Sequence, residues 1–192
     1  MQSFILIGYR GTGKTTVAQK LAARLEIPAC DSDVEIERSV GKSIADIFAQ
    51  DGESAFRDRE ESVIAEILSW SVSLVLATGG GAILRSSTRE RLRQAGRVIW
   101  LTATPETILR RISSDAASQT MRPNLTALPM YEEIVAVLEQ RTPLYAETAH
   151  ETLETDTLTA EEIVETILAN GNSDIQDTQG SRLSSGFRRV PE

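Results

Sequence analysis

The chain has 192 residues, 41% of them hydrophobic and 25% charged, which suits one globular domain with a sizeable core. Its net charge of −8 argues against a broad nucleic-acid surface, because phosphate backbones attract clustered Lys and Arg. The single cysteine, Cys30, excludes an internal disulfide, and we see neither a secretion signal nor a long apolar stretch. We expect a cytoplasmic, monomeric protein that binds neither nucleic acid nor membranes.

The first predicted element is a buried strand at 3–8, which leads into a complete phosphate-binding motif. Residues 8–15 read Gly-Tyr-Arg-Gly-Thr-Gly-Lys-Thr and match G-x-x-x-x-G-K-[ST], with a run of good helix formers behind them. Glycines let the backbone curl its N–H groups around a phosphate, while the helix N-terminus and Lys14 add positive charge. The Thr15 hydroxyl is suited to Mg²⁺. The order strand, loop, helix favours nucleotide binding over an ordinary glycine turn.

The second predicted strand, at 28–31, leads into two carboxylates, Asp31 and Asp33. In open α/β sheets, ligands bind outside the carboxyl ends of the strands. One carboxylate can hold Mg²⁺ or its water, and the other can accept a proton from a substrate hydroxyl. A structural interpretation stands beside this one, in which Ser32 caps the next helix and the aspartates favour its dipole. The residues alone leave both interpretations open.

An amphipathic helix is predicted at 52–69, with Phe56, Val63, Ile64, Ile67 and Leu68 on its core face. This helix also carries Arg57. Guanidinium groups bind carboxylates through paired hydrogen bonds. Ion pairs with helix neighbours three or four residues away are nevertheless the default explanation for any one arginine here.

The third predicted strand, at 73–78, ends in Thr78-Gly79-Gly80-Gly81. Three glycines leave a surface without side chains, so that a ring or hydroxyl can approach the backbone closely. Plain turns also use such sequences, so the triplet alone is weak evidence. The acidic residue that ordinarily ends this strand in phosphate-loop proteins is missing, which favours Asp31 as the metal ligand.

Strands predicted at 96–102, with the apolar run Val98-Ile99-Trp100-Leu101, and at 151–155 complete five strands that alternate with helical segments. This alternation predicts an α/β domain with a parallel sheet. Helix starts carry capping signals: Ser32 with Glu35, Ser87 with Glu90, and Thr159 with Glu162 match the capping box, and Thr104 precedes a proline. The triplet Arg141-Thr142-Pro143 predicts a break in a helix that starts near Tyr131.

Two segments are expected to be less ordered than the rest. Residues 113–129 are rich in Ser, Thr, Asp and Asn and contain Arg122-Pro123, which suggests a mobile lid over the nucleotide. Residues 170–192 are polar and show no periodicity, which predicts a disordered tail. The predicted organisation is therefore a single domain at 1–169, with its lid at 113–129, followed by the tail.

Taken together, these motifs resemble those of shikimate kinases, small P-loop kinases related in fold to nucleoside monophosphate kinases. The resemblance covers residues 4–168. Beside the loop at 8–15, the matching segments are Asp31-Ser32-Asp33 with Glu35-Ile36-Glu37, Gly41-Lys42-Ser43-Ile44-Ala45-Asp46-Ile47-Phe48, Phe56-Arg57-Asp58-Arg59-Glu60-Glu61, Thr78-Gly79-Gly80-Gly81, Arg122-Pro123 and Arg141-Thr142-Pro143-Leu144-Tyr145. Any one segment is modest evidence, whereas their order and spacing together are highly specific.

The resemblance implies that ATP phosphorylates the 3-hydroxyl of shikimate, giving shikimate 3-phosphate on the route to aromatic amino acids. It also implies a three-layer α/β/α fold around five parallel strands, with ATP as co-substrate and Mg²⁺ as cofactor.

The resemblance further implies a role for individual residues. The catalytic group comprises Asp33, which is the candidate base and holds the ring hydroxyls, together with Lys14 and Arg122. By the same resemblance, Arg57 and Arg141 bind the substrate carboxylate, in a pocket lined by Gly79, Gly80 and Gly81. ATP is held by Gly11, Thr12, Gly13, Lys14, Thr15, Thr16, Arg111 and Arg122, and Mg²⁺ by Thr15 and Asp31.

The chain departs from the family pattern in its lid, which is longer than usual between Arg111 and Arg122 and continues as Asn124-Leu125-Thr126 where two leucines are common. A kinase of another small polyol or acid, such as a gluconate-type acceptor, is therefore an alternative, although a neutral acceptor would not need both Arg57 and Arg141. Another alternative is a nucleotide-binding regulator that binds ATP without transferring phosphate.

Overall fold

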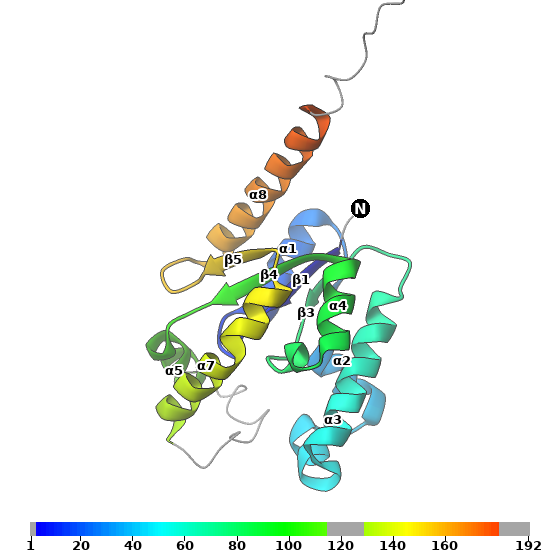
Figure 1. Ribbon diagram of the computed structural model, residues 1–192, viewed down its shortest axis with the longest axis vertical. Helices are drawn as coiled ribbons and strands as arrows, with labels where there is room; N and C mark the ends of the chain where they lie inside the picture. Colours follow the sequence, from blue (N-terminus) through cyan, green and yellow to red (C-terminus); the bar gives the residue numbers. More distant parts are fainter. Residues whose placement is uncertain (1–2, 115–128, 181–192) are drawn as a thin grey trace, which may run out of the picture.

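The computed structural model describes residues 3–114 and 129–180, with 171–180 described by their backbone alone. Five strands form one sheet in the order β2-β3-β1-β4-β5 (Figure 1). They are β1 Ser3–Ile7, β2 Ala29–Asp31, β3 Val75–Ala77, β4 Gly96–Thr102 and β5 Glu151–Glu154. Every neighbouring pair is parallel, and Ile5 of the central strand pairs with Leu76 on one side and Val98 on the other. The five predicted strands are thereby confirmed.

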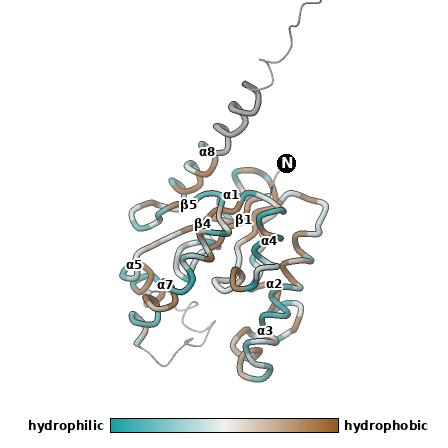
Figure 2. Tube along the Cα trace, viewed as in Figure 1, coloured by the Kyte–Doolittle hydropathy of each residue, from teal (hydrophilic) through white to brown (hydrophobic). Residues whose placement is uncertain are grey.

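Helices cover both faces of this sheet. They are α1 Lys14–Leu25, α2 Ser32–Val40, α3 Ile44–Leu68, α4 Ser86–Ala95, α5 Pro105–Ser114, α7 Met130–Thr148 and α8 Ala160–Gly180, with a short 3₁₀ helix η1 at Ala82–Leu84. Along β1, Ile5 and Ile7 join the core under α2, α3 and α4, whereas Leu6 joins the core under α1 and α8. Hydrophobic and hydrophilic stretches alternate along α3, α4 and α7, as expected of helices with one buried face (Figure 2). The expected three-layer α/β/α arrangement is confirmed.

A third, smaller core lies beyond the carboxyl end of β1. There the Tyr9 ring packs with Ile108 and Ile112 of α5 and with Ile134 and Val137 of α7. The two helices lie side by side in Figure 1. This small core joins the segment that follows β1 to both helices, which matters for the site described below.

The helix predicted at 52–69 lies within α3, and its predicted core face is confirmed. Phe56, Val63, Ile64 and Ile67 are buried in the core against the sheet, and Leu68 packs against them partly buried. The helix begins earlier than predicted, at Ile44, and is kinked at Gly52, whose φ of 80° is the left-handed conformation that glycine tolerates.

The predicted break at 141–143 is wrong, because α7 runs from Met130 to Thr148 with Pro143 inside it. The reason is a tertiary contact. Arg141 and Tyr145, four residues apart on one face of the helix, both donate hydrogen bonds to the carbonyl oxygen of Gly80, at 3.0 and 2.6 Å. These contacts hold α7 in place on both sides of Pro143, whose missing backbone N–H leaves one helix hydrogen bond unformed.

The predicted capping role of Ser32 is wrong. Asp31 is the N-cap of α2, and its Oδ1 accepts a hydrogen bond from the backbone N–H of Asp33 at 3.0 Å. The Ser32 hydroxyl lies one position inside the helix, where it accepts from the backbone N–H of Gly79 at 3.0 Å. An aspartate directly before the serine satisfies the helix end first.

Of the other two predicted capping boxes, one is wrong and one is confirmed. Ser87 with Glu90 does not cap α4, whose N-cap is Arg85. Thr159 and Glu162 do form the predicted capping box at α8, with the N–H of Thr159 donating to Glu162 Oε2 at 2.8 Å and the N–H of Glu162 donating to Thr159 Oγ1 at 3.2 Å.

Several predicted features fall wholly or largely outside the described residues. Of the lid at 113–129, only residues 113, 114 and 129 are described, and Arg122 is not among them. The boundary predicted after residue 169 falls inside α8, whose backbone is helical to Gly180, and residues 181–192 lie outside the described part. The division into domain and tail therefore stays a prediction. Among the described residues, no helix is both long and apolar enough to cross a membrane.

Candidate active site

The phosphate-binding motif forms a loop between β1 and α1 at the carboxyl edge of the sheet. Gly8, Gly11 and Gly13 have φ values of 142°, 79° and 91°, which other residues rarely adopt. A side chain at Gly8 would also place its Cβ 2.4 Å from the carbonyl oxygen of Leu101. Gly13 is the N-cap of α1 and has no side chain to bond the first N–H groups of the helix. These N–H groups point to an anion site.

Lys14 is buried beneath this loop, with 8% of its surface exposed. Its Nζ donates a hydrogen bond to the carbonyl oxygen of Tyr9 at 2.8 Å, and the hydroxyl of Thr12 donates to the same oxygen at 2.8 Å. The charged residue of the motif therefore braces the loop and supplies positive charge beside its N–H groups. Burial raises the pKa of the Tyr9 phenol above its usual value, against the opposing effect of the Arg10 charge.

The two predicted metal ligands are in contact. Thr15 Oγ1 donates a hydrogen bond to Asp31 Oδ2 at 2.7 Å, while Asp31 Oδ1 accepts from the backbone of Asp33. Among the described residues, no group of three or more His, Cys, Asp or Glu side chains could hold a metal by itself. Mg²⁺ commonly uses one or two protein carboxylates together with substrate phosphates. One hydroxyl and one carboxylate beside a phosphate loop therefore fit Mg²⁺ bound with a nucleotide.

The triple glycine lies against Arg57. A Cβ placed on Gly81 would be only 2.3 Å from Nη1 of Arg57, so any other residue at this position would displace the guanidinium. Arg57 is 7% exposed and is held by ion pairs with Glu60 at 2.6 Å and Glu53 at 3.1 Å. The helix-neighbour ion pairs expected from the sequence are thus present, and they coexist with a position at the glycine surface.

Arg141 reaches the same surface from α7. Its Nη1 donates to the carbonyl oxygen of Gly80 at 3.0 Å, and its Nε is buried without a hydrogen-bond partner among the described residues. Gly80 in turn lies beside the phosphate loop, since a Cβ placed on it would lie 3.4 Å from the carbonyl oxygen of Gly8. The structure therefore brings the loop, the triple glycine and both arginines together at one edge of the sheet.

The remaining predicted nucleotide residues lie around the loop. Arg111 of α5 donates to the carbonyl oxygen of Gly11 at 3.3 Å and to the Thr155 hydroxyl at 2.9 Å. Thr15 and Thr16 are exposed in the first turn of α1. Arg122, as noted, lies outside the described residues.

Sequence reasoning missed one ion pair at this edge. Nη2 of Arg10, inside the loop, lies 2.9 Å from Oε1 of Glu133, on α7. The side chains are 17% and 0% exposed. A charged residue in the middle of a phosphate loop was the available signal for Arg10. Nothing in the local pattern points to Glu133, because the two residues are 123 positions apart.

Comparisons with known proteins agree on one family. The family model for shikimate kinase matches residues 10–171. A protein of Rhodopirellula baltica named shikimate kinase is 40% identical over 174 residues, which cover 91% of this chain and 92% of that protein. The solved shikimate kinase of Acinetobacter baumannii in complex with shikimate has a TM-score of 0.85 at 40% identity and covers 91% of this chain and 94% of its own. A gluconokinase structure from Sinorhizobium meliloti has a TM-score of 0.56 at 16% identity, covers 95% of this chain and 97% of its own, and shows the fold alone.

Proposed function

The chain belongs to the shikimate kinase family, and we propose that its reaction is carried out by the residues gathered at the carboxyl edge of the sheet. The reaction is the transfer of the γ-phosphoryl group of ATP to the 3-hydroxyl of shikimate, which gives shikimate 3-phosphate in aromatic amino acid biosynthesis. Phosphoryl transfer depends chiefly on positioning and on charge neutralisation. We therefore assign the positioning and the charge neutralisation to particular side chains.

The acceptor is held by its carboxylate between Arg57 and Arg141. The observation that carries this assignment is the buried Nε of Arg141, which lacks a partner among the described residues and would be satisfied by a carboxylate oxygen. Arg57 Nε and Nη2 both donate to Glu53 Oε1, at 3.3 and 3.1 Å. The Glu53 side chain is 60% exposed, so a substrate carboxylate can replace it while the buried pair with Glu60 stays. Two guanidinium groups would then fix the ring over the triple glycine.

The reacting hydroxyl is oriented by Asp33, which takes its proton as the transfer proceeds. Its neighbours in the chain support this role: Asp31 contacts Thr15 of the phosphate loop, and Ser32 accepts a hydrogen bond from Gly79 of the triple glycine. We therefore assign the base to a position between the acceptor pocket and the nucleotide. The N–H groups of the loop, with Lys14, stabilise the charge on the β- and γ-phosphates.

Thr15 and Asp31 would hold Mg²⁺ through their oxygen atoms. When bound, the ion supplies charge neutralisation to the phosphates of ATP. Arg111 sits beside the loop, where it can approach the nucleotide, and Arg122 is assigned to the closed site by family resemblance alone. In the same way, the monomeric state, the cytoplasmic location and the lack of nucleic-acid partners are proposed from the sequence.

The experiment is an ADP-release assay with the full chain, ATP and Mg²⁺ across a panel of acceptors. We expect rapid turnover with shikimate, a ³¹P NMR signal for the 3-phosphate, and no turnover with gluconate. Faster turnover with gluconate would favour the other-acceptor kinase. ATP binding by calorimetry without turnover on any acceptor would favour a non-catalytic regulator. Omitting Mg²⁺ tests the metal assignment, since activity should then disappear and should return when Mg²⁺ is restored.

A further inference from the structure

We propose that Arg10 and Glu133 are a positioning pair that fixes the phosphate-binding loop against α7, so that nucleotide and acceptor stay aligned during transfer. Neither residue carries a role in the reaction described above. The inference rests on the proposed function, in which the loop binds ATP and Arg141 of α7 binds the acceptor.

The pair is short and almost fully removed from water. Nη2 of Arg10 lies 2.9 Å from Oε1 of Glu133, whose side chain is completely buried. The Arg10 guanidinium also lies 5.8 Å from the centre of the Tyr9 ring, which itself packs against α5 and α7. Removing two charges from water is costly, so a buried ion pair gives little net stability compared with apolar residues of similar volume. A role in geometry accounts for this pair better than a role in stability.

The placement of the pair on α7 supports this role. Glu133 and Arg141 are eight residues apart on the same helix, a separation of about 12 Å along its axis at 1.5 Å per residue. Arg141 is bonded to Gly80, which lies beside the loop: a Cβ placed on Gly80 would be 3.4 Å from the carbonyl oxygen of Gly8 and 3.6 Å from the backbone nitrogen of Arg10. The helix is therefore attached to the loop directly through Glu133 and is also bonded, through Arg141, to a glycine beside the loop.

Two attachments constrain a helix more than one. Apolar packing of Ile134 and Val137 against Tyr9 also holds the start of α7 near the loop, but such packing is non-directional, and small shifts would change the distance between Arg141 and the phosphates. The Arg10–Glu133 bond adds a directional constraint against such shifts, because it ties the start of α7 to the centre of the loop. A misplacement of about 1 Å can cost on the order of 100-fold in rate. A pair that prevents such movement should thus affect kcat more than KM.

The test compares Glu133→Gln with a matched control, Glu151→Gln. Glu151 forms a largely buried ion pair with Arg97, with side chains 14% and 10% exposed, at the amino ends of β5 and β4. Glutamine keeps the shape and removes the charge in both variants. We expect Glu133→Gln to lower kcat about 10- to 100-fold, with KM for ATP and for shikimate within about threefold. In Glu151→Gln, kcat should stay within about twofold even where the melting temperature falls equally.

Three further variants extend the test to Arg10, so that it does not depend on the folding of Glu133→Gln alone. Arg10→Lys keeps the charge and should lower kcat less than Arg10→Gln does. The double variant Arg10→Gln/Glu133→Gln should be no slower than the slower of its single variants, because the two side chains act as one unit. Any of three results would overturn the positioning role: an unchanged kcat in Glu133→Gln, equal losses of kcat in Glu133→Gln and Glu151→Gln, or additive losses of kcat in the double variant.

These outcomes are separate from failure of the proposed function. If the wild-type chain does not phosphorylate shikimate, the function is wrong. If it does, and only the Arg10–Glu133 results fail, the function stands without the positioning pair.

Discussion

Both edges of the sheet carry arginines, but α1 begins at the carboxyl edge, whereas α7 ends at the amino edge. At the carboxyl edge, α1 begins with glycines, and its first N–H groups are left for a ligand. At the amino edge, Nη1 of Arg93 donates to three carbonyl oxygens where α7 ends, those of Glu147, Thr148 and Ala149, at 2.9, 3.1 and 3.0 Å. The carboxyl edge thus offers backbone N–H donors to a ligand, whereas the carbonyl acceptors at the end of α7 are already bonded to Arg93.

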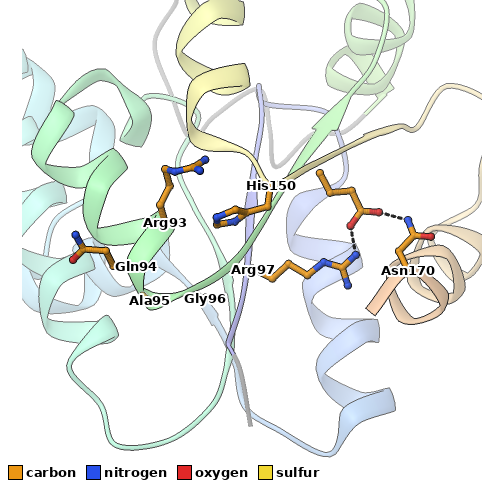
Figure 3. Close-up of a pocket in the computed structure, with 8 residues that line it drawn as sticks. Arg93, Gln94, Ala95, Gly96, Arg97, His150 and Asn170 are labelled. Carbon is orange, nitrogen blue, oxygen red and sulfur yellow. Dashed lines mark hydrogen bonds and ion pairs between the residues drawn. The ribbon is translucent and has the colours of Figure 1, made fainter. Parts of the chain in front are cut away.

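A pocket of about 510 Å³ at the amino edge sharpens this contrast. It is lined in part by Arg93, Arg97, His150 and Asn170 (Figure 3). Yet Arg97 is paired with Glu151, and Asn170 donates to the same carboxylate. A basic pocket is therefore not by itself an anion site. The direction of helices in a parallel sheet places their positive ends at the carboxyl edge, where ligands bind.

Removal of the proposed base at the carboxyl edge should have the largest effect on activity. Asp33→Asn should lower kcat about 10²- to 10⁴-fold, because the hydroxyl loses its proton acceptor. ATP binding, measured by calorimetry, should stay close to that of the wild-type chain. A fully active Asp33→Asn variant would remove the chemical role from this edge.

The acceptor clamp comes next in size. Arg141→Lys keeps the charge but loses the planar guanidinium, so KM for shikimate should rise about 10- to 100-fold, as expected for loss of a charge-assisted hydrogen bond. KM for ATP should change little. Steady-state kinetics with each substrate varied in turn separates the two values. Equal increases for both substrates would mean that Arg141 does not act on the acceptor.

The amino edge should respond in stability only. Arg93→Gln removes the donor from three carbonyl groups at the end of α7 and should lower the melting temperature by about 3–10 °C, measured by circular dichroism. Shikimate turnover at 25 °C should stay within about twofold. Arg91→Gln on the same helix is the matched surface control and should change neither value. A large loss of turnover in Arg93→Gln would show that the two edges are not independent.

The smallest expected effect is a pH dependence at the same edge. His150 Nδ1 accepts a hydrogen bond from the backbone N–H of Val98 at 3.0 Å. Burial, with Arg93 and Arg97 nearby, lowers the pKa of His150 below its usual 6.5. The unfolded chain therefore binds a proton more readily, so stability is lost as the pH falls below about 6.5.

Melting curves between pH 7 and 5 measure this effect. His150→Asn, whose Oδ1 takes the place of Nδ1 as the acceptor for Val98, should show a shallower loss of stability over that range. Identical slopes for the two proteins would rule out a contribution from His150.

Much of the fold could be predicted because its signals are local. Continuous apolar runs marked the buried strands, and the glycine-lysine-threonine pattern marked the loop after the first of them. The Thr159–Glu162 cap was predictable because all its atoms lie within four residues. The motif order also identified the family, which the comparisons confirmed.

Other features depended on contacts between distant residues. Pro143 would end a helix in isolation, but Arg141 and Tyr145 hold α7 to Gly80, more than sixty positions away. Ser32 has a capping sequence, yet its hydroxyl serves the backbone of Gly79. For Arg57, helix ion pairs were the default explanation from the local pattern, and its place over Gly81 follows from the packing of α3 beside η1, which begins directly after that glycine.

The sheet, the phosphate loop and the family could be predicted from the sequence, because apolar runs and glycine motifs lie in consecutive residues. The contacts of Arg10 with Glu133 and of Arg141 with Gly80 emerged only in the fold. A charge in one segment finds its partner through the path of the intervening chain, and the residues beside it carry no record of that partner.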